Sequence, residues 1–207
     1  MIAILDYGMG NVKSISNMLK RLGYQSILTQ TPAEILAADR IILPGVGAFD
    51  TAMNRLRDSG LIPHLEQAVF QNDTPLLGIC LGMQLLAQRS DEGLTPGLGW
   101  IAGEVLPFRF EQERKRLPVP HMGWNKVSTQ QPHPLFDGLM DNSFFYFVHS
   151  YHFVPALQAS TLATATYGYD FTCAVSQRNI MGVQFHPEKS HKYGMRMLKN
   201  FVEHAYV

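Results

Sequence analysis

Short apolar runs alternate with amphipathic segments along the first hundred residues of the chain. The apolar runs, at residues 2–5, 26–28, 40–45 and 75–79, have the length and composition of strands. The segments that follow them, from about residues 12, 32, 48 and 64, carry apolar residues at helical spacing, and another predicted helix, 81–89, follows the last run directly. This order predicts an α/β fold with a mostly parallel central sheet flanked by helices.

The expected helix boundaries depend on a few polar and glycine residues. Asn11 is expected to cap the first helix, and Gly23 to end it in a left-handed conformation. Thr31 and Glu34 have the spacing of a capping box at the start of the second helix.

The second half of the chain has a different character. Residues 105–185 are rich in β-branched and aromatic residues, in short runs broken by glycine, proline and asparagine. The clearest predicted strands are 144–155, 161–167 and 180–185, and the last 18 or so residues predict a helix. We expect an added antiparallel, strand-rich region and, because no linker interrupts the sequence, a single domain over residues 1–207.

The charge balance excludes some classes of partner. Lysine plus arginine and aspartate plus glutamate number 17 each, so no net charge attracts nucleic acid or an anionic membrane. Asp6 and Asn11 interrupt the stretch that a signal peptide would need, and no apolar run has membrane-spanning length. Two cysteines, Cys80 and Cys173, are too few for a disulfide framework, so we expect reduced thiols in a cytoplasmic protein.

Cys80 lies between two glycines where a predicted strand runs into a predicted helix. In the sequence from Gly78 to Gly82, this arrangement is typical of a nucleophile held on a sharp, strained turn. The positive end of a helix dipole also favours a thiolate. The pattern predicts a nucleophilic cysteine, and the alternative is a buried, unreactive one, because free cysteine is among the most buried residue types.

His186 ends another predicted strand and is followed two residues later by Glu188. A cysteine nucleophile needs an imidazole to take its proton, and the imidazole needs a third group to fix its tautomer. Cys80, His186 and Glu188 are therefore expected to form a catalytic triad. The alternative for His186 is a loop histidine that caps the C-terminal helix.

The sequence from Pro44 to Gly47 ends a further parallel strand, near the expected position of an active-site crevice. The backbone amides of Val46 and of Leu81, directly after the nucleophile, are expected to form an oxyanion hole. An ordinary tight turn is the alternative for residues 44–47.

His149 and His152 suggest metal ligands. A separation of three residues along one strand directs them to opposite faces, so we expect no metal site.

The segments PGVG, GICLGMQ and QFHPE, in this order and at these separations, resemble those of the class I (triad) glutamine amidotransferases over nearly the whole chain. The resemblance implies a flavodoxin-like fold and a cofactor-free reaction, in which L-glutamine and water give glutamate and ammonia through a thioester on Cys80. It also implies that Gln84, one helical turn after Cys80, helps to hold the α-carboxylate of glutamine, with Gly47 in the same substrate site.

Three further segments, DYGMGN (6–11), HMGWN (121–125) and YFVHSY (146–151), resemble the glutaminase subunit of imidazole glycerol phosphate synthase, an enzyme of histidine biosynthesis. The resemblance implies that His149, Ser150 and Tyr151 line the glutamine pocket and that Glu92 receives the α-amino group. Without the resemblance, Glu92 is a surface carboxylate in the polar turn RSDEG.

The same resemblance implies a heterodimer with a (β/α)8-barrel cyclase that consumes the ammonia. The residues expected to meet the barrel are Tyr7, Gly8, Met9, Gly10, Asn11, Trp124, Tyr146 and Lys189. Trp124 has a core aromatic as its alternative role, although tryptophan also anchors interfaces. Members of this family are nearly silent without a loaded synthase, so we hypothesise that the PGVG loop reorients one amide to complete the oxyanion hole.

Other functions compete with this prediction. The nearest is a class I glutaminase that serves another synthase, such as that of anthranilate, or a γ-glutamyl hydrolase without a partner. A non-catalytic module with the same fold is a second alternative, although the complete triad argues against it. A cysteine protease is a third, but the sequence has no recognisable signature of a peptide cleft.

Overall fold

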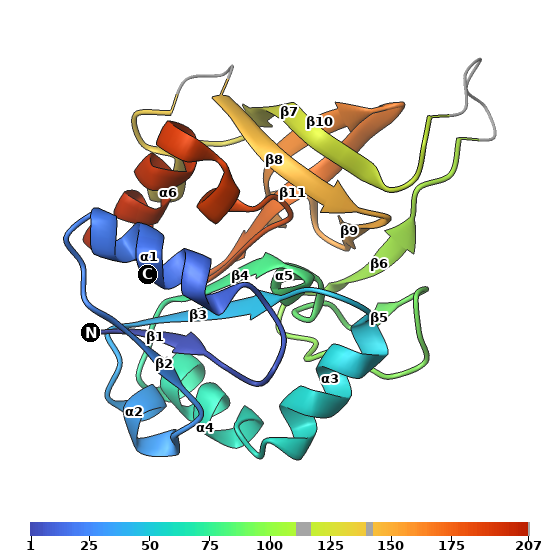
Figure 1. Cartoon of the computed structure of the whole chain (residues 1–207). Coiled ribbons are helices and arrows are strands. Elements are labelled where there is room, and N and C mark those ends of the chain that lie inside the picture. Colours follow the sequence, from blue (N-terminus) through green and yellow to red (C-terminus); the bar gives the residue numbers. More distant parts are fainter. Residues whose placement is uncertain (111–116, 140–142, 207) are drawn as a thin grey trace.

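A single mixed sheet runs through the protein (Figure 1), whose computed structural model describes residues 1–110, 117–139 and 143–206. Its strands are β1 (Ile2–Leu5), β2 (Ser26–Thr29), β3 (Arg40–Gly45), β4 (Leu76–Cys80), β5 (Arg89–Ser90), β6 (Gly103–Pro107), β7 (His121–Thr129), β8 (Ser143–His149), β9 (Tyr151–Pro155), β10 (Thr161–Tyr167), β11 (Tyr169–Gln177) and β12 (Ile180–Val183). Its main order is β2-β1-β3-β4-β12-β11-β10-β7-β8, and β9, β6 and β5 branch from β11.

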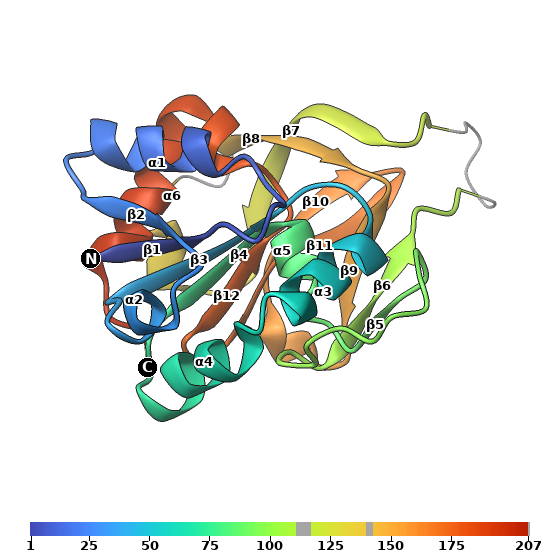
Figure 2. The same cartoon turned by 60° about the horizontal axis from the view of Figure 1, so that its bottom comes forward.

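The helices lie on both faces of the parallel half of the sheet. They are α1 (Val12–Arg21), α2 (Pro32–Leu36), α3 (Phe49–Asp58), α4 (Ile62–Glu66), which continues into a π-helical turn (Gln67–Gln71), α5 (Leu81–Gln84) and α6 (His191–Glu203), with short 3₁₀ turns at Pro134–Phe136, Gln158–Ser160 and Pro187–Lys189. Figures 1 and 2 show α1 and α6 on one face and α2, α3 and α4 on the other.

The apolar pattern of β1 explains this two-sided packing. Ile2 and Ile4 belong to the core beneath α1 and α6, whereas Ala3 and Leu5 belong to the core beneath α2, α3 and α4. A strand that is buried on both faces needs apolar residues at every position, as the run IAIL provides. Strands β1 to β4 and β12 pair in parallel.

The second half of the sheet is antiparallel, through β12, β11, β10, β7 and β8. The predicted fold class, a mostly parallel sheet with an added antiparallel region, is confirmed. The two halves meet at β12, which pairs in parallel with β4 and antiparallel with β11. Just after β12, the backbone amide of His186 donates to the carbonyl of Tyr146 in β8 at 2.8 Å.

Some predicted boundaries are wrong. The helix expected over residues 81–89 ends at Gln84, because Gln88 donates to the carbonyl of Gly103, and the carbonyls of Leu85 and Ala87 accept from Leu98 and Gly99 instead of continuing a helix. The strand expected over 144–155 is broken at its middle, between β8 and β9.

The predicted side-chain caps are also wrong. Asn11 makes no side-chain cap. Thr31 makes none either. Its backbone amide donates to the hydroxyl of Thr29, and it is this hydroxyl that donates to the carboxylate of Glu34. Gly23, in contrast, has the predicted left-handed conformation, with φ of 88°.

Parts of two predictions lie outside the described residues, namely 111–116 and 140–142 of the strand-rich region and Val207 of the last helix. The single-domain organisation stays a prediction, which the continuous sheet supports. Within the described ranges, none of the helices has both the length and the apolar character needed to cross a bilayer.

Candidate active site

Cys80 lies at the sharp turn between β4 and α5, in the middle of the parallel sheet. Its φ of 55° is in the left-handed region, which is strained for a residue with a side chain. Strand β3 runs on one side of β4, with Gly45 paired to Cys80, and β12 runs on the other. The turn therefore presents the thiol at the carboxyl ends of parallel strands, where α/β proteins bind their ligands.

Glycines allow α5 to start immediately after the sheet. A Cβ atom on Gly82 would collide with the carbonyl oxygen of Leu43 in β3, and one on Gly78 would lie 2.7 Å from the carbonyl oxygen of Gly82. A Cβ atom on Gly45 would lie 2.7 Å from the backbone nitrogen of Gly82. The sharp turn at Cys80 is therefore possible only because these positions lack side chains.

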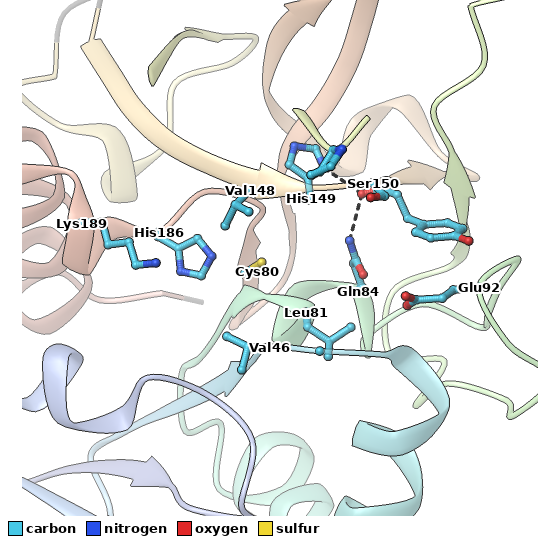
Figure 3. A pocket seen from close by; sticks show the side chains of 13 residues that line it. Val46, Cys80, Leu81, Gln84, Glu92, Val148, His149, Ser150, His186 and Lys189 are labelled. Atoms are coloured by element: carbon cyan, nitrogen blue, oxygen red, sulfur yellow. Dashed lines mark hydrogen bonds between the residues drawn. The ribbon is translucent and has the colours of Figure 1, made fainter. Parts of the chain in front are cut away.

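His186 and Glu188 form a buried pair beside the cysteine. Nδ1 of His186 lies 2.8 Å from Oε1 of Glu188, and the exposed fractions of the two side chains are 3% and 1%. Burial lowers the pKa of His186, but its interactions with Cys80 and with Glu188 outweigh this effect and raise the pKa above its ordinary value. Within the described residues Nε2 of His186 makes no hydrogen bond, and Figure 3 shows the imidazole next to the sulfur.

These groups open into a cavity of about 340 Å³, a size that suits a small ligand. Its lining residues are Val46, Gly47, Cys80, Leu81, Gln84, Glu92, Pro120, Val148, His149, Ser150, Tyr151, His186 and Lys189 (Figure 3). Of the predicted catalytic, oxyanion and substrate residues, only Glu188 is not among them, because it lies behind His186. The structure thus brings the predicted site residues together.

Glu92 is not the surface carboxylate of the alternative interpretation. Its side chain lines the cavity, and Oε2 accepts a hydrogen bond of 2.9 Å from the backbone amide of Phe49, the first residue of α3. Burial raises the pKa of Glu92; the Phe49 amide counteracts this rise, and the nearby Asp50 adds to it. A carboxylate in this position can accept hydrogen bonds from a bound ammonium group.

Gln84 uses both hydrogens of its side-chain amide within the protein. Nε2 donates to the carbonyl of Tyr151 at 3.0 Å and to Oε1 of Gln184 at 2.9 Å. Since only the acceptor oxygen of Gln84 remains, its arrangement suits a donor better than the α-carboxylate assigned to it by resemblance. That assignment stays a prediction.

Gln184, Pro120 and Val148 were missed as site residues in the sequence. Nε2 of Gln184 donates to Sγ of Cys80 at 3.7 Å, and the other two line the cavity. Gln184 is the one polar residue in the predicted strand 180–185, and a fully buried amide beside the nucleophile is the signal that could have identified it.

The expected interface residues fall into two groups. Tyr7 and Met9 are buried inside the chain, where the hydroxyl of Tyr7 donates to the carbonyl of Pro44 at 2.6 Å. Trp124 is 46% exposed, so the core alternative is wrong, and its ring stacks on His191 at 5.3 Å. The ammonium group of Lys189 lies 5.5 Å from the centre of the Tyr146 ring. The interface itself stays a prediction.

The reason for excluding a metal at His149 and His152 is wrong. The strand breaks between them, and both imidazoles pack on the same ring of Phe108, at 5.2 and 5.0 Å. Each forms a hydrogen bond elsewhere, with His121 and with Tyr169.

Comparison with known proteins gives the family. The family model named Glutamine amidotransferase class-I matches residues 3–205, so the chain belongs to the class I glutamine amidotransferases. It is 50% identical over 203 residues to "Imidazole glycerol phosphate synthase subunit HisH 2" of Pseudomonas aeruginosa, covering 98% of this chain and 99% of that protein. A protein of the same name from Methanococcus maripaludis is 50% identical over 205 residues, 99% of this chain and 100% of that protein. Within its class the chain therefore belongs to the HisH subunits of imidazole glycerol phosphate synthase, and the predicted family and function are confirmed.

Solved structures support the fold. "Crystal structure of glutamine amidotransferase" has a TM-score of 0.75 at 20% identity, covering 98% of this chain and 97% of that one. PurLQS from Thermotoga maritima has a TM-score of 0.72 at 13% identity, covering 97% and 96%. At these identities the likeness concerns the fold alone.

Proposed function

We propose that Cys80, His186 and Glu188 hydrolyse the side-chain amide of L-glutamine and that the ammonia passes to a synthase partner. The observation that carries this proposal is the thiol on a strained turn beside an imidazole whose other nitrogen lies 2.8 Å from a buried carboxylate. Glu188 holds Nδ1, so Nε2 is the nitrogen that faces the nucleophile.

In the first half of the reaction, Nε2 of His186 takes the thiol proton and Sγ of Cys80 attacks the amide carbon. The amides of Leu81 and Val46 donate to the developing oxyanion. The imidazolium then gives its proton to the leaving nitrogen, which departs as ammonia and leaves a γ-glutamyl thioester.

In the second half, water attacks the thioester carbon while His186 takes its proton. The C–S bond then breaks, the imidazolium returns the proton to Sγ of Cys80, and glutamate leaves. Gln184 donates to the sulfur throughout, which suits a negatively charged leaving group. The carboxylate of Glu92 receives the α-amino group at the other end of the cavity, and His149, Ser150 and Tyr151 form its wall.

The relatives' names as synthase subunits support a partner that uses the ammonia. From the family resemblance we assign this role to a (β/α)8-barrel cyclase in a heterodimer. A bound partner suits the chemistry, because ammonia released into water is protonated and lost as a nucleophile. Trp124, Tyr146 and Lys189 contact the barrel together with the exposed parts of the loop from Gly8 to Asn11. The buried Tyr7 supports the PGVG segment through its hydrogen bond to the Pro44 carbonyl. Both cysteines are free, which suits the reducing cytoplasm.

The direct test replaces the nucleophile. Cys80→Ala in the reconstituted complex is expected to lower glutamate release by at least about a thousandfold, because thioester formation is lost. Cys173→Ala is the matched control, since Cys173 is fully buried in β11 away from the cavity, and it should retain most of the parent rate. An unchanged rate in Cys80→Ala rules out the proposed nucleophile and revives the non-catalytic alternative.

A further inference from the structure

A chain of buried hydrogen bonds leads from β7 to the wall of the glutamine cavity. Nδ1 of His121 lies 3.1 Å from Nε2 of His149, and Nδ1 of His149 lies 2.8 Å from the carbonyl oxygen of Tyr151. His121 and His149 are 3% and 6% exposed. The chain begins at Asn125, whose Nδ2 lies 3.2 Å from Nε2 of His121.

The Tyr151 end fixes the direction of these hydrogen bonds. A carbonyl oxygen can only accept, so Nδ1 of His149 carries a proton and donates it. In a neutral imidazole the other nitrogen is then an acceptor. Nε2 of His149 therefore accepts from Nδ1 of His121.

The Asn125 end gives the same direction independently. Its Nδ2 donates to the carbonyl of Thr166 at 2.9 Å, and its Oδ1 accepts from the amide of Lys126 at 2.8 Å, so the orientation of the amide is determined. The second hydrogen of Nδ2 points to Nε2 of His121, which must accept it. Nδ1 of His121 is then the protonated nitrogen, as the other end requires.

Burial keeps both imidazoles neutral. It lowers the pKa of His121 to about 4 and is also the largest cause that lowers the pKa of His149, to about 3. At neutral pH each ring therefore has one donor and one acceptor.

The chain ends at the part of the wall that needs precise support. Tyr151 follows the break between β8 and β9, and its carbonyl also accepts from Gln84, which lines the cavity. The preceding carbonyl, of Ser150, accepts from the amide of Phe108 at 3.1 Å. With the tautomer of His149 reversed, two acceptors would face each other and the wall would lose one support.

We propose that His121 is a positioning residue for glutamine: by donating to Nε2 of His149, it stabilises the tautomer that bonds to the Tyr151 carbonyl and so holds the Ser150–Tyr151 wall in its binding position. The proposal rests on the glutaminase function proposed above, because it concerns the same cavity. It gives His121, which does not line the cavity, a role in substrate affinity and none in bond breaking.

Two substitutions at one position separate hydrogen bonding from packing. His121→Leu keeps an apolar group of similar bulk without a donor, whereas the amide nitrogen of His121→Asn replaces Nδ1. In the reconstituted complex, His121→Leu is expected to raise KM for glutamine about fivefold, the effect of one lost hydrogen bond, with kcat within about twofold of the parent. His121→Asn should restore KM to within about twofold of the parent.

His152→Leu is the matched control. His152 is buried against the same phenyl ring, but its Nε2 bonds to the Tyr169 hydroxyl instead of the wall. Its KM should stay within about twofold of the parent. Equal KM values for His121→Leu, His121→Asn and His152→Leu would overturn the proposal. A fall in kcat for His121→Leu as large as its rise in KM would also overturn it.

Nitrogen-15 NMR of the histidine-labelled chain measures the tautomer directly and does not depend on enzymatic activity. The parent should carry the His149 proton on Nδ1, and His121→Leu, which keeps only the bias of the Tyr151 carbonyl, should show a larger fraction with the proton on Nε2 than the parent does. A parent with the proton on Nε2 would overturn the proposal. If the parent complex releases no glutamate, the proposed glutaminase function is wrong, and so is the proposed effect on KM. The tautomer measurement still decides whether His121 controls the protonation of His149.

Discussion

Buried histidines make the stability of this chain depend on pH. Burial lowers the pKa of His121 and His152 to about 4 and that of His149 to about 3. Among the described residues, His186, Tyr167 and Tyr169 are titratable neighbours of these imidazoles. In the unfolded chain these imidazoles titrate near their ordinary pKa of about 6.5. The unfolded chain then binds more protons below this pH, so their contribution to stability is complete above about 6.5 and is lost as the pH falls towards 4.

His121→Asn removes one of these groups and should reduce the sensitivity to acid. Between pH 7.5 and pH 5 the parent should lose about 1–2 kcal/mol more free energy of unfolding than the variant. Over this range His121 becomes protonated in the unfolded chain but stays neutral in the folded one. Urea unfolding at both pH values measures the two losses. Equal losses in parent and variant would show that His121 titrates normally in the folded chain.

The sequence pointed more directly to the proposed catalytic residues than to the residues proposed to support them. Cys80, His186 and Glu188 lie in local patterns whose chemistry can be recognised from neighbouring residues. Gln184 and His121 act through partners that are far away in the sequence, and only the folded sheet brings these pairs together. The role of Gln84 was assigned by resemblance, whereas its hydrogen bonds depend on the distant Tyr151 and Gln184.

At the scale of elements, the start of α5 packs directly against the backbone of β3. Gly82 touches β3 through its backbone, and the amide of Leu81, next to it, is the proposed oxyanion donor. The length of α5 was mispredicted because residues 85–88 bond to the segment 97–103, a tertiary contact that overrides helical periodicity. The strands of the parallel half were predicted more accurately, because their apolar runs are determined by burial on both faces.

Gly82→Ala tests this packing. The added methyl group would force α5 away from Leu43, so we expect a loss of about 3 kcal/mol or more in free energy of unfolding and the loss of most glutaminase activity. Gly60→Ala is the control, because Gly60 has φ of 69° but no atom within 4 Å of an added Cβ. It should cost about 1–2 kcal/mol from backbone strain alone, with activity retained. Equal costs in denaturant unfolding would contradict the steric explanation.

At the scale of the whole molecule, the outer face of β7 and β8 is the surface best suited to a partner. Trp124 pairs with Tyr146 across the two strands, and Met122 and Phe144 on the same face are 62% and 44% exposed. An exposed aromatic and apolar surface of this kind is typical of a protein interface. It lies next to Lys189 at the rim of the cavity, so a partner bound here would receive ammonia close to its source.

Trp124→Ala should therefore weaken binding to the cyclase about tenfold or more, because the variant loses a large aromatic anchor at the centre of this surface. The free energy of unfolding should fall by less than about 1 kcal/mol, since the indole is half exposed and packs mainly on His191. Leu157→Ala removes another exposed apolar side chain, between β9 and β10, and should leave the affinity unchanged. Titration calorimetry with the purified cyclase measures the three affinities, and equal values for the parent and Trp124→Ala would exclude this face as the docking surface.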